Sequence, residues 1–188
     1  MEKLRTPWLP VRRELSDYFL PRRYPWLASQ TEITSAADRN TKLLSSVSLT
    51  ALRTLGIGMM NGITSPLRPW FSLHLSGPAL SDELQAEELR RYLEECARRM
   101  HRIMAKSNFY SAFGILYTEL PCFGTASLGI YEDPDTVFRC YNDAVGEFFL
   151  DVDYRRTVNR HGRKFRLTLE QMEQDFGAEA LSPTMREK

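Results

Sequence analysis

The chain has 188 residues, a length at which one domain, or one domain with a subordinate piece, can bury a core without disulfides or metals. Its hydrophobic fraction of 43% and charged fraction of 26% are ordinary for a globular protein. The formal net charge of +1 excludes a whole-chain attraction to nucleic acid or to an anionic membrane, so any basic site must be local.

The cysteines and the apolar runs exclude further classes of protein. Cys96, Cys122 and Cys140 are odd in number and widely spaced, which argues against a disulfide framework and against a zinc knuckle. No apolar run has the length of a signal peptide or a membrane span. The chain is therefore expected to be made in the cytosol and to have no membrane partner.

The first predicted part, residues 1–36, combines a short helix with an arm. Apolar residues recur near helical spacing between Pro7 and Pro21, and charged residues occupy the other side. Residues 22–35 are mostly polar, contain Pro25 and show little periodicity, which is typical of an arm or a loop.

The second predicted part, residues 37–121, begins with a long helix from Asp38 to Met60. The second half of this helix is apolar nearly all round, which indicates that it is covered on several sides. Gly56 and Gly58 weaken a helix, a cost that predicts close packing of a neighbouring backbone at both positions. Gly62 is expected to end the helix in a left-handed conformation.

Two more helices and one short strand complete this second part. Residues 70–75 read Trp-Phe-Ser-Leu-His-Leu and predict a short, mostly buried strand. Ser81 can cap a second long helix, whose outer face offers the ion pairs Glu87 with Arg91, Glu94 with Arg98, and Glu95 with Arg99. A third helix is expected to start at Ser107 or Asn108 and to end at Pro121.

The third predicted part, residues 122–177, consists of short strands. Strand-like runs at 125–131, 137–141, 147–152, 157–160 and 164–168 are separated by turn signals at Asp133-Pro134, Asn142-Asp143 and His161-Gly162. Thr168 and Gln171 predict a capping box for a last helix that stops at Gly177. Residues 178–188 are expected to form a flexible tail. Helices followed by an antiparallel β region define an α+β protein.

The chain lacks the short motifs of nucleotide binding, serine hydrolysis and zinc proteolysis. Asp151 and Asp153 alternate to one face of a predicted strand and could bind a divalent cation together with Asp133 or Asp135. No third ligand is fixed by spacing, so we interpret these acids as solvated surface residues. Cys96 and His101 point to different faces of one helix, which argues against a nucleophile pair. The prediction is no enzyme, no cofactor and no metal.

A basic hairpin is the second functional hypothesis. Tyr154 and Phe165 are interleaved with the cations Arg155, Arg156, Arg160, Arg163, Lys164 and Arg166. Such a pattern suits contact with nucleic acid, here double-stranded DNA without sequence preference. The alternative is that the cations lie on the solvent side of an edge strand, where they discourage pairing with strands of other chains. The near-neutral total charge favours this second interpretation. The basic group Arg12, Arg13, Arg22 and Arg23 has the same two interpretations.

The third hypothesis is a structural subunit whose function is assembly. Three Trp, eight Tyr and ten Phe residues supply a large apolar area to a chain without catalytic motifs, in its core or at an interface. Trp8, Trp70, Phe71 and Phe123 are the candidate structural or interface anchors. For Trp70 we favour a place in the core.

The order of landmarks resembles the N-terminal part of the portal, or head-to-tail connector, proteins of short-tailed bacteriophages. The similarity extends over about residues 5–177, and no single motif carries it. Its landmarks are Trp8 to Tyr18 with Pro21, Gly62 to Pro66, Pro69 to Phe71, Ser107 to Phe109, Phe123 to Ala126, Gly146 to Phe148, and Phe165 with Phe176-Gly177.

The resemblance implies a non-enzymatic homo-oligomeric ring, a dodecamer in the family, at one vertex of the capsid. Such a ring works with terminase, capsid or scaffold proteins and tail proteins during genome packaging and ejection, in the virion and, during assembly, in the host cytoplasm. This chain would supply the outer, wing-like part of the subunit. Family members continue into stem, clip and crown, so the chain is interpreted as a fragment or a truncated prophage product.

Overall fold

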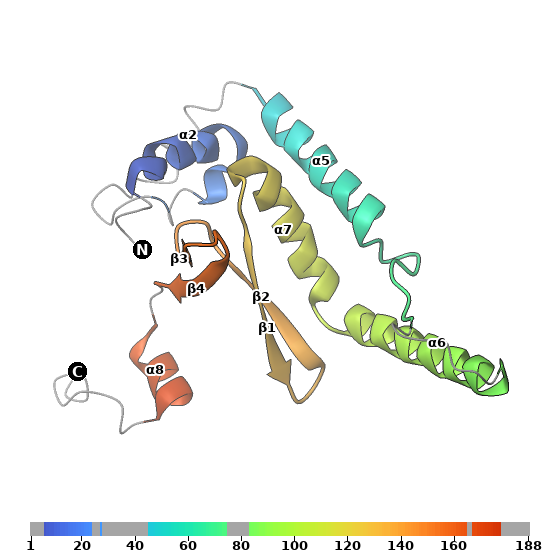
Figure 1. The fold of residues 1–188 in the computed structure, drawn as a ribbon. Helices are drawn as coiled ribbons and strands as arrows, with labels where there is room; N and C mark the ends of the chain where they lie inside the picture. Colours follow the sequence, from blue (N-terminus) through green and yellow to red (C-terminus); the bar gives the residue numbers. More distant parts are fainter. Residues whose placement is uncertain (1–5, 24–26, 28–44, 75–82, 165–166, 178–188) are drawn as a thin grey trace. The chain divides into compact units, whose positions relative to one another are not determined.

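The structure is a computed structural model that describes residues 6–23, 27, 45–74, 83–164 and 167–177. The chain forms two compact units, Glu2–Gly146 and a smaller one from Glu147 onward. Helices come first and two small antiparallel sheets follow (Figure 1), which confirms the α+β prediction. Within the described residues no helix is both long and apolar enough to cross a membrane. The four-part division into 1–36, 37–121, 122–177 and 178–188 stays a prediction.

The first unit is built around helix α7 (Phe109–Phe123). The elements that precede it are η1 (Thr6–Trp8), α2 (Leu9–Phe19), η2 (Pro21–Arg23), α5 (Val47–Ile63) and α6 (Glu83–Lys106). Helix α7 contacts α2, α5 and α6, and also the hairpin of β1 (Ser127–Asp133) and β2 (Val137–Asp143). Its sequence is apolar on most sides because neighbours cover most sides.

An aromatic cluster forms the centre of this unit. Phe109, at the start of α7, is 4% exposed, and its ring stacks on Phe113 with the centroids 4.2 Å apart. Trp70 and Phe138 contact the other sides of the Phe109 ring, with centroids at 6.2 and 6.3 Å. The cluster therefore joins a loop, a helix and a strand.

Two asparagines fix the β1–β2 hairpin to the helices. The Asn108 side chain donates to the carbonyl of Cys140 at 2.7 Å and accepts from the Cys140 amide at 2.8 Å. The Asn142 side chain donates to the carbonyl of Ala112 at 3.0 Å. Asn108 precedes α7 as expected, but its side chain is committed to β2 and does not cap the helix.

The helix ends predicted at Gly62 and Pro121 were misplaced, whereas α2 lies between Pro7 and Pro21 as expected. Helix α5 continues through Gly62 to Ile63, because the chain turns only at Thr64, whose hydroxyl donates to the Tyr117 hydroxyl at 3.2 Å. Helix α7 includes Pro121 and stops at Gly124, which has φ of 71° and donates its amide to Leu120 at 2.9 Å. A tertiary contact of Thr64 thus sets the end of α5, and the left-handed conformation of Gly124 sets the end of α7. The first half of the predicted Asp38 helix lies outside the described residues.

Residues 70–74 form an irregular segment instead of the predicted strand, and Leu75 lies outside the described residues. A strand requires a hydrogen-bonded neighbour. Within the described residues the backbone of Pro69–His74 makes no ladder hydrogen bonds. The segment is instead held by side chains, since Trp70 Nε1 donates to the Tyr110 hydroxyl at 3.4 Å and the Phe71 and His101 rings lie 4.2 Å apart.

Of the predicted ion pairs on α6, Glu87 with Arg91 and Glu95 with Arg99 are present at 3.3 and 3.0 Å. Arg98, expected to pair with Glu94, contacts Glu95 at 2.8 Å instead. These pairs are exposed to solvent, which screens them, so they contribute little to the stability of the fold. The predicted cap Ser81 lies outside the described residues.

The second unit contains a hairpin and a short helix. Strands β3 (Phe148–Val152) and β4 (Val158–Arg163) pair antiparallel, and α8 (Leu169–Phe176) follows. The predicted turn at His161-Gly162 lies inside β4, and the real turn forms where Asp153 accepts hydrogen bonds from the amides of Arg155 and Thr157. The strand expected at 164–168 is absent from its described residues. The capping box of α8 and its stop at Gly177 are confirmed.

Gly56 and Gly58 of α5 are expected to respond oppositely to alanine. A Cβ atom at Gly56 would lie 3.2 Å from the Tyr117 carbonyl, whereas one at Gly58 would meet nothing within 4 Å among the described residues. The close approach predicted for both glycines therefore holds only for Gly56. We expect Gly58→Ala to raise the free energy of unfolding by about 0.5–1 kcal/mol. Gly56→Ala should give no gain, and urea unfolding of both variants measures the difference.

Candidate functional site

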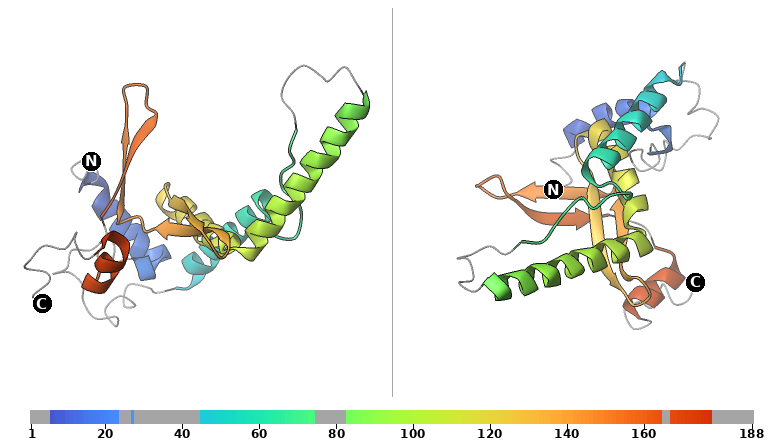
Figure 2. Two further views of the ribbon diagram at one scale, coloured as in Figure 1. Left: turned by 90° about the horizontal axis from the view of Figure 1, so that it is seen from below. Right: turned by 90° about the vertical axis from the view of Figure 1, so that its right-hand side faces the viewer.

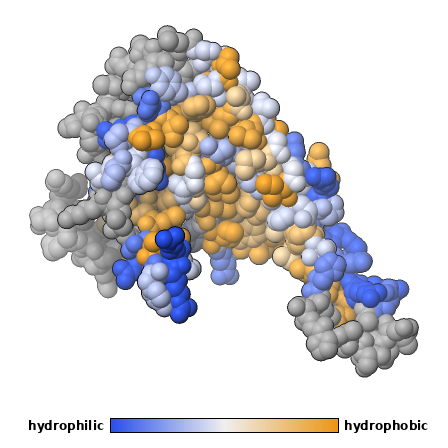
Figure 3. Space-filling model, turned by 45° about the horizontal axis from the view of Figure 1, so that its top comes forward, coloured by the Kyte–Doolittle hydropathy of each residue, from blue (hydrophilic) through white to orange (hydrophobic). Residues whose placement is uncertain are grey.

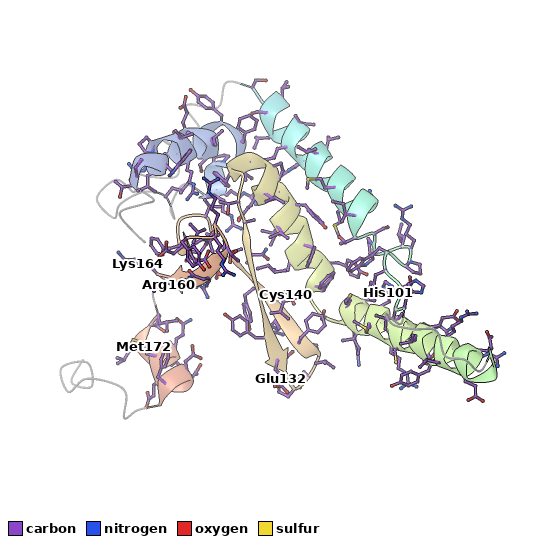
Figure 4. The ribbon with its side chains drawn as sticks, in the orientation of Figure 1. His101, Glu132, Cys140, Arg160, Lys164 and Met172 are labelled. Carbon is purple, nitrogen blue, oxygen red and sulfur yellow. The ribbon has the colours of Figure 1, made fainter. Side chains whose placement is uncertain are left out.

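The cations of the predicted basic hairpin lie along the whole length of β3–β4, from its turn to the end of β4. Arg155 and Arg156 lie in its turn, Arg160 and Arg163 lie in β4, and Lys164 follows the strand; all five are exposed. Figure 4 labels Arg160 and Lys164 on this hairpin. Arg166 and Phe165 lie outside the described residues. The predicted hairpin with its turn at His161-Gly162 is therefore wrong, because these cations belong to the β3–β4 hairpin, which turns at residues 153–157. Their binding of DNA stays a prediction.

Neighbouring groups offset part of this positive charge. Arg163 contacts the carboxylate of Glu147 at 3.8 Å, and Arg160 lies opposite Asp151 in the strand register. At the tip, the Arg155 guanidinium lies 5.2 Å from the centroid of the Tyr154 ring and donates to the Tyr154 hydroxyl at 2.7 Å. The tip therefore presents an exposed aromatic ring with a stacked cation, which could contact an anionic, partly apolar ligand.

The four candidate anchors fall in different environments. Trp8 is 63% exposed and Phe123 is buried at 8%. Trp70 and Phe71 are half-buried against α6 and α7. Phe123 is thus part of the core of its own chain, whereas Trp8 is open to a neighbour.

A groove lies between the segment Pro69–His74 and α6, and we call it the α6 groove. Its volume is about 480 Å³. Phe71, Leu73 and Ala97 give it an apolar floor, and the polar residues around them are Ser72, His74, Arg90, Glu94, Arg98 and His101. Figure 2 shows the segment beside α6 in both of its views. Two arginines and one carboxylate line the groove, and Arg90 and Arg98 each also contact a glutamate outside the lining, Glu87 and Glu95.

Helix α5 carries a second open surface. Only Leu52 and Gly56 of this helix are buried, although its sequence indicated cover on several sides. Large apolar residues stay exposed along it, namely Val47 at 72%, Leu55 at 50%, Ile57 at 61% and Ile63 at 54%. Val47 and Leu55 share one side of the helix with Ala51 and Met59, whereas Ile57 and Ile63 point to other sides. Figure 3 shows apolar side chains gathered over the region of α5 and α7. A monomeric protein rarely leaves so much apolar area in contact with water.

The carboxylates considered for metal binding have local structural tasks. Asp153 holds the β3–β4 turn, and Asp151 accepts from the amide of Val152 at 3.0 Å. The Thr136 hydroxyl donates to Asp133 and, as the main cause, holds the pKa of that carboxyl below its usual range. Over the described ranges no three His, Cys, Asp or Glu residues gather as a metal site would require.

The cysteines are placed for packing. Burial raises the pKa of the Cys122 thiol to about 12, with the nearby Glu119 as a second cause, and burial also raises the pKa of Cys140. Both thiols therefore stay protonated near neutral pH, whereas a nucleophile must be a thiolate. His101, which the sequence indicates is not paired with Cys96, has its Nε2 atom 3.4 Å from the Phe71 carbonyl oxygen and lines the α6 groove.

A buried ion pair was missed by the sequence analysis. Glu119 of α7 is 2% exposed, and its carboxylate contacts the guanidinium of Arg23 from η2. Arg23 had been interpreted as part of a basic surface group. A signal did exist, because Glu119 is the only charged residue between Phe109 and Phe123, and a lone acid in an apolar helix needs a partner.

Comparison with known proteins gives the family. The family model described as bacteriophage head to tail connecting protein matches residues 1–188. A probable portal protein of Bordetella phage BPP-1 is 37% identical over 182 residues, covering 97% of this chain and 32% of the relative. The portal protein of Salmonella phage epsilon15 is 35% identical over 173 residues, covering 92% of this chain and 30% of the relative. The chain spans about a third of the length of these curated relatives, and it belongs to the bacteriophage head-to-tail connecting, or portal, protein family.

Proposed function

We propose that the chain forms the N-terminal, wing-like part of a portal subunit, a structural protein that assembles with copies of itself into a ring. The ring would occupy one vertex of the phage head and pass the DNA during packaging and ejection. Terminase, capsid or scaffold proteins and tail proteins would be its partners, in the virion and, during assembly, in the host cytoplasm. The role would be structural, with no catalysis.

The observation that carries this proposal is the exposed apolar side of α5 in a chain of the portal family. Covering such a surface removes apolar area from water, which drives the association of subunits. The same helix packs on α7 through Gly56, so it is a rigid part of the first unit and not a frayed end. A rigid apolar face suits a permanent neighbour.

A chimeric portal protein tests the proposal. The segment of the epsilon15 portal protein that matches this chain would be replaced by residues 1–188, and the chimera supplied to cells infected with a portal-deficient epsilon15 phage. We expect the chimera to enter the heads and to restore DNA-filled particles, seen by electron microscopy and plaque counts. A soluble, folded chimera that never enters the heads would contradict the proposal.

A second candidate function is non-specific contact with double-stranded DNA by the β3–β4 hairpin. The supporting observation is the exposed tip, where Arg155 stacks on Tyr154, which is 86% exposed, beside the exposed Arg156. Phosphate contacts by arginine would make the binding sensitive to salt. Glu147 and Asp151 offset part of the charge of Arg160, Arg163 and Lys164, whereas the two tip arginines adjoin the exposed Tyr154 ring, so we propose the tip as the part that would bind.

For this hairpin we expect the double variant Arg155→Ala/Arg156→Ala to bind a DNA duplex more weakly. The magnitude of the slope of log affinity against log salt concentration should fall by about 1.8, because each lost phosphate contact lowers it by about 0.9. Fluorescence anisotropy at several salt concentrations measures both quantities. Arg22→Ala/Arg12→Ala removes the same charge from the other basic group and is the matched control. An equal loss of DNA affinity in both double variants would mean that the hairpin contributes no more to DNA binding than the other basic group does.

A further inference from the structure

We propose that the tip of the β1–β2 hairpin of one copy of this chain docks into the α6 groove of a second copy. The tip is defined by Tyr131, Glu132, Asp135 and Val137. The inference rests on the proposed function, because it supplies a contact by which copies would stand side by side. It names two surfaces that the comparison with the family does not assign.

The α6 groove offers cations around an apolar floor. Arg90 and Arg98 line it, and Glu94 is the one carboxylate among its described lining residues. Glu87 lies 3.9 Å from Arg90 and Glu95 lies 2.8 Å from Arg98. Both arginines remain mostly exposed, at 75% and 59% of their side chains. Exposed pairs of this kind are weak, so a closer carboxylate can displace them.

The segment Pro69–His74 gives the groove a second means of recognition. Its composition is that of a strand, yet within the described residues it has no ladder partner. An extended segment of another chain can complete such an edge through main-chain hydrogen bonds. Strands β1 and β2 form a two-stranded sheet, and among the described residues β1 has no second strand on its other edge. The outer edge of β2 is instead bonded to the Asn108 side chain at Cys140.

The hairpin tip has the complementary character. Glu132 and Asp135 are exposed carboxylates, and Asp133 between them is held in its ionised form by the Thr136 hydroxyl. Figure 4 shows Glu132 at the far end of the hairpin from α7. Tyr131 and Val137 add apolar area, because they are 58% and 59% exposed. An acidic tip with two apolar side chains matches a groove of cations over an apolar floor.

Backbone strain marks the same tip. Val137 has φ of 73°, a left-handed conformation that is unfavourable for a β-branched residue. Strain of this kind persists where the surrounding structure or a function requires it. Here it places an exposed valine at the first position of β2, beside the acidic residues.

The contact would be heterologous, because the groove and the tip are different surfaces of the same chain. Each copy would use its tip on one neighbour and offer its groove to another. Repeating such a contact gives a closed ring when the rotation closes and an open filament when it does not. A groove-to-tip contact therefore leads to the kind of assembly proposed above.

Charge reversal on each surface tests the inference with the 188-residue chain. The groove variant is Arg90→Glu/Arg98→Glu, and the tip variant is Glu132→Lys/Asp135→Lys. We expect sedimentation velocity to show self-association of the wild type that weakens with salt, and each variant to associate at least about tenfold more weakly, because like charges then face each other. Mixing the two variants should restore association, since each reversed surface meets a reversed partner.

Arg91→Glu/Arg99→Glu is the matched control. It makes the same change of charge on α6 outside the groove lining and should leave association unchanged, with circular dichroism confirming the fold of every variant. A wild type that stays monomeric, a loss confined to the groove variant, or a mixture that does not reassociate would each overturn the inference. A loss confined to the groove variant would assign the groove to another occupant. If the chimera enters heads while these variants behave as wild type, only the groove-to-tip contact fails.

Discussion

Phe109→Ala is expected to lower the free energy of unfolding of the first unit by about 3–5 kcal/mol, the range for removing a buried aromatic ring. Phe109 is 4% exposed and contacts Trp70, Phe113 and Phe138. Its loss removes contacts to the segment after α5, to the next turn of α7 and to β2 at once. Three neighbours from different elements cannot all move in to fill one cavity.

Urea unfolding followed by circular dichroism measures this effect. Tyr92→Ala is the control, because Tyr92 is 66% exposed on α6 and exposed substitutions cost within about 0.5 kcal/mol. Trp70→Ala should give an intermediate cost, since Trp70 is half-buried. If Phe109→Ala costs no more than Tyr92→Ala, the aromatic cluster is not the core of this unit.

Local signals in the sequence predicted local structure well. Thr168 and Gln171 form the predicted capping box, and Gly177 stops the helix with φ of 80°. These features depend on residues three or four positions apart, which a sequence displays directly. The order of helices followed by antiparallel hairpins was also predictable, because periodicity changes where α7 ends.

Features that depend on distant contacts were not predictable. Gly62 looked like a helix stop, but Thr64 decides the turn through a hydrogen bond to Tyr117, 53 positions away. His161-Gly162 looked like a turn, but both residues pair with β3 while Asp153 builds the real turn. Residues 70–74 have the composition of a strand without a partner in the described chain. Their irregular form follows from a missing neighbour and not from their own preferences.

Among the candidate surfaces, too, those formed by residues close in sequence were predictable, and those formed by distant residues were not. The cations of the β3–β4 hairpin were visible in the sequence because they lie within ten positions of one another. The α6 groove was not visible, because it joins Phe71 to Arg98 and His101 across a large separation in sequence. The acidic hairpin tip was considered only as a source of metal ligands. Its exposure beside Tyr131 and Val137 needed the strand register.

Arg23→Met is expected to destabilise the first unit by about 3–5 kcal/mol, because it leaves a buried carboxylate without its guanidinium partner. Glu119 is 2% exposed and cannot reach water without opening the contact between η2 and α7. Glu119→Gln should cost less, about 1–3 kcal/mol. In that variant the Arg23 side chain, which is 23% exposed, can turn toward solvent. The two halves of one ion pair are thus expected to respond unequally.

Urea unfolding of both single variants and of the double variant measures this asymmetry. Arg22→Met is the matched control, since Arg22 is the exposed neighbour in the same short helix, and it should change stability by at most about 0.5 kcal/mol. The double variant should lose less than the sum of the two single losses, because once Glu119 is neutral the guanidinium no longer offsets a buried charge. Equal costs for Arg23→Met and Arg22→Met would show that the carboxylate does not depend on Arg23, and that residues 21–23 dock on α7 by packing alone.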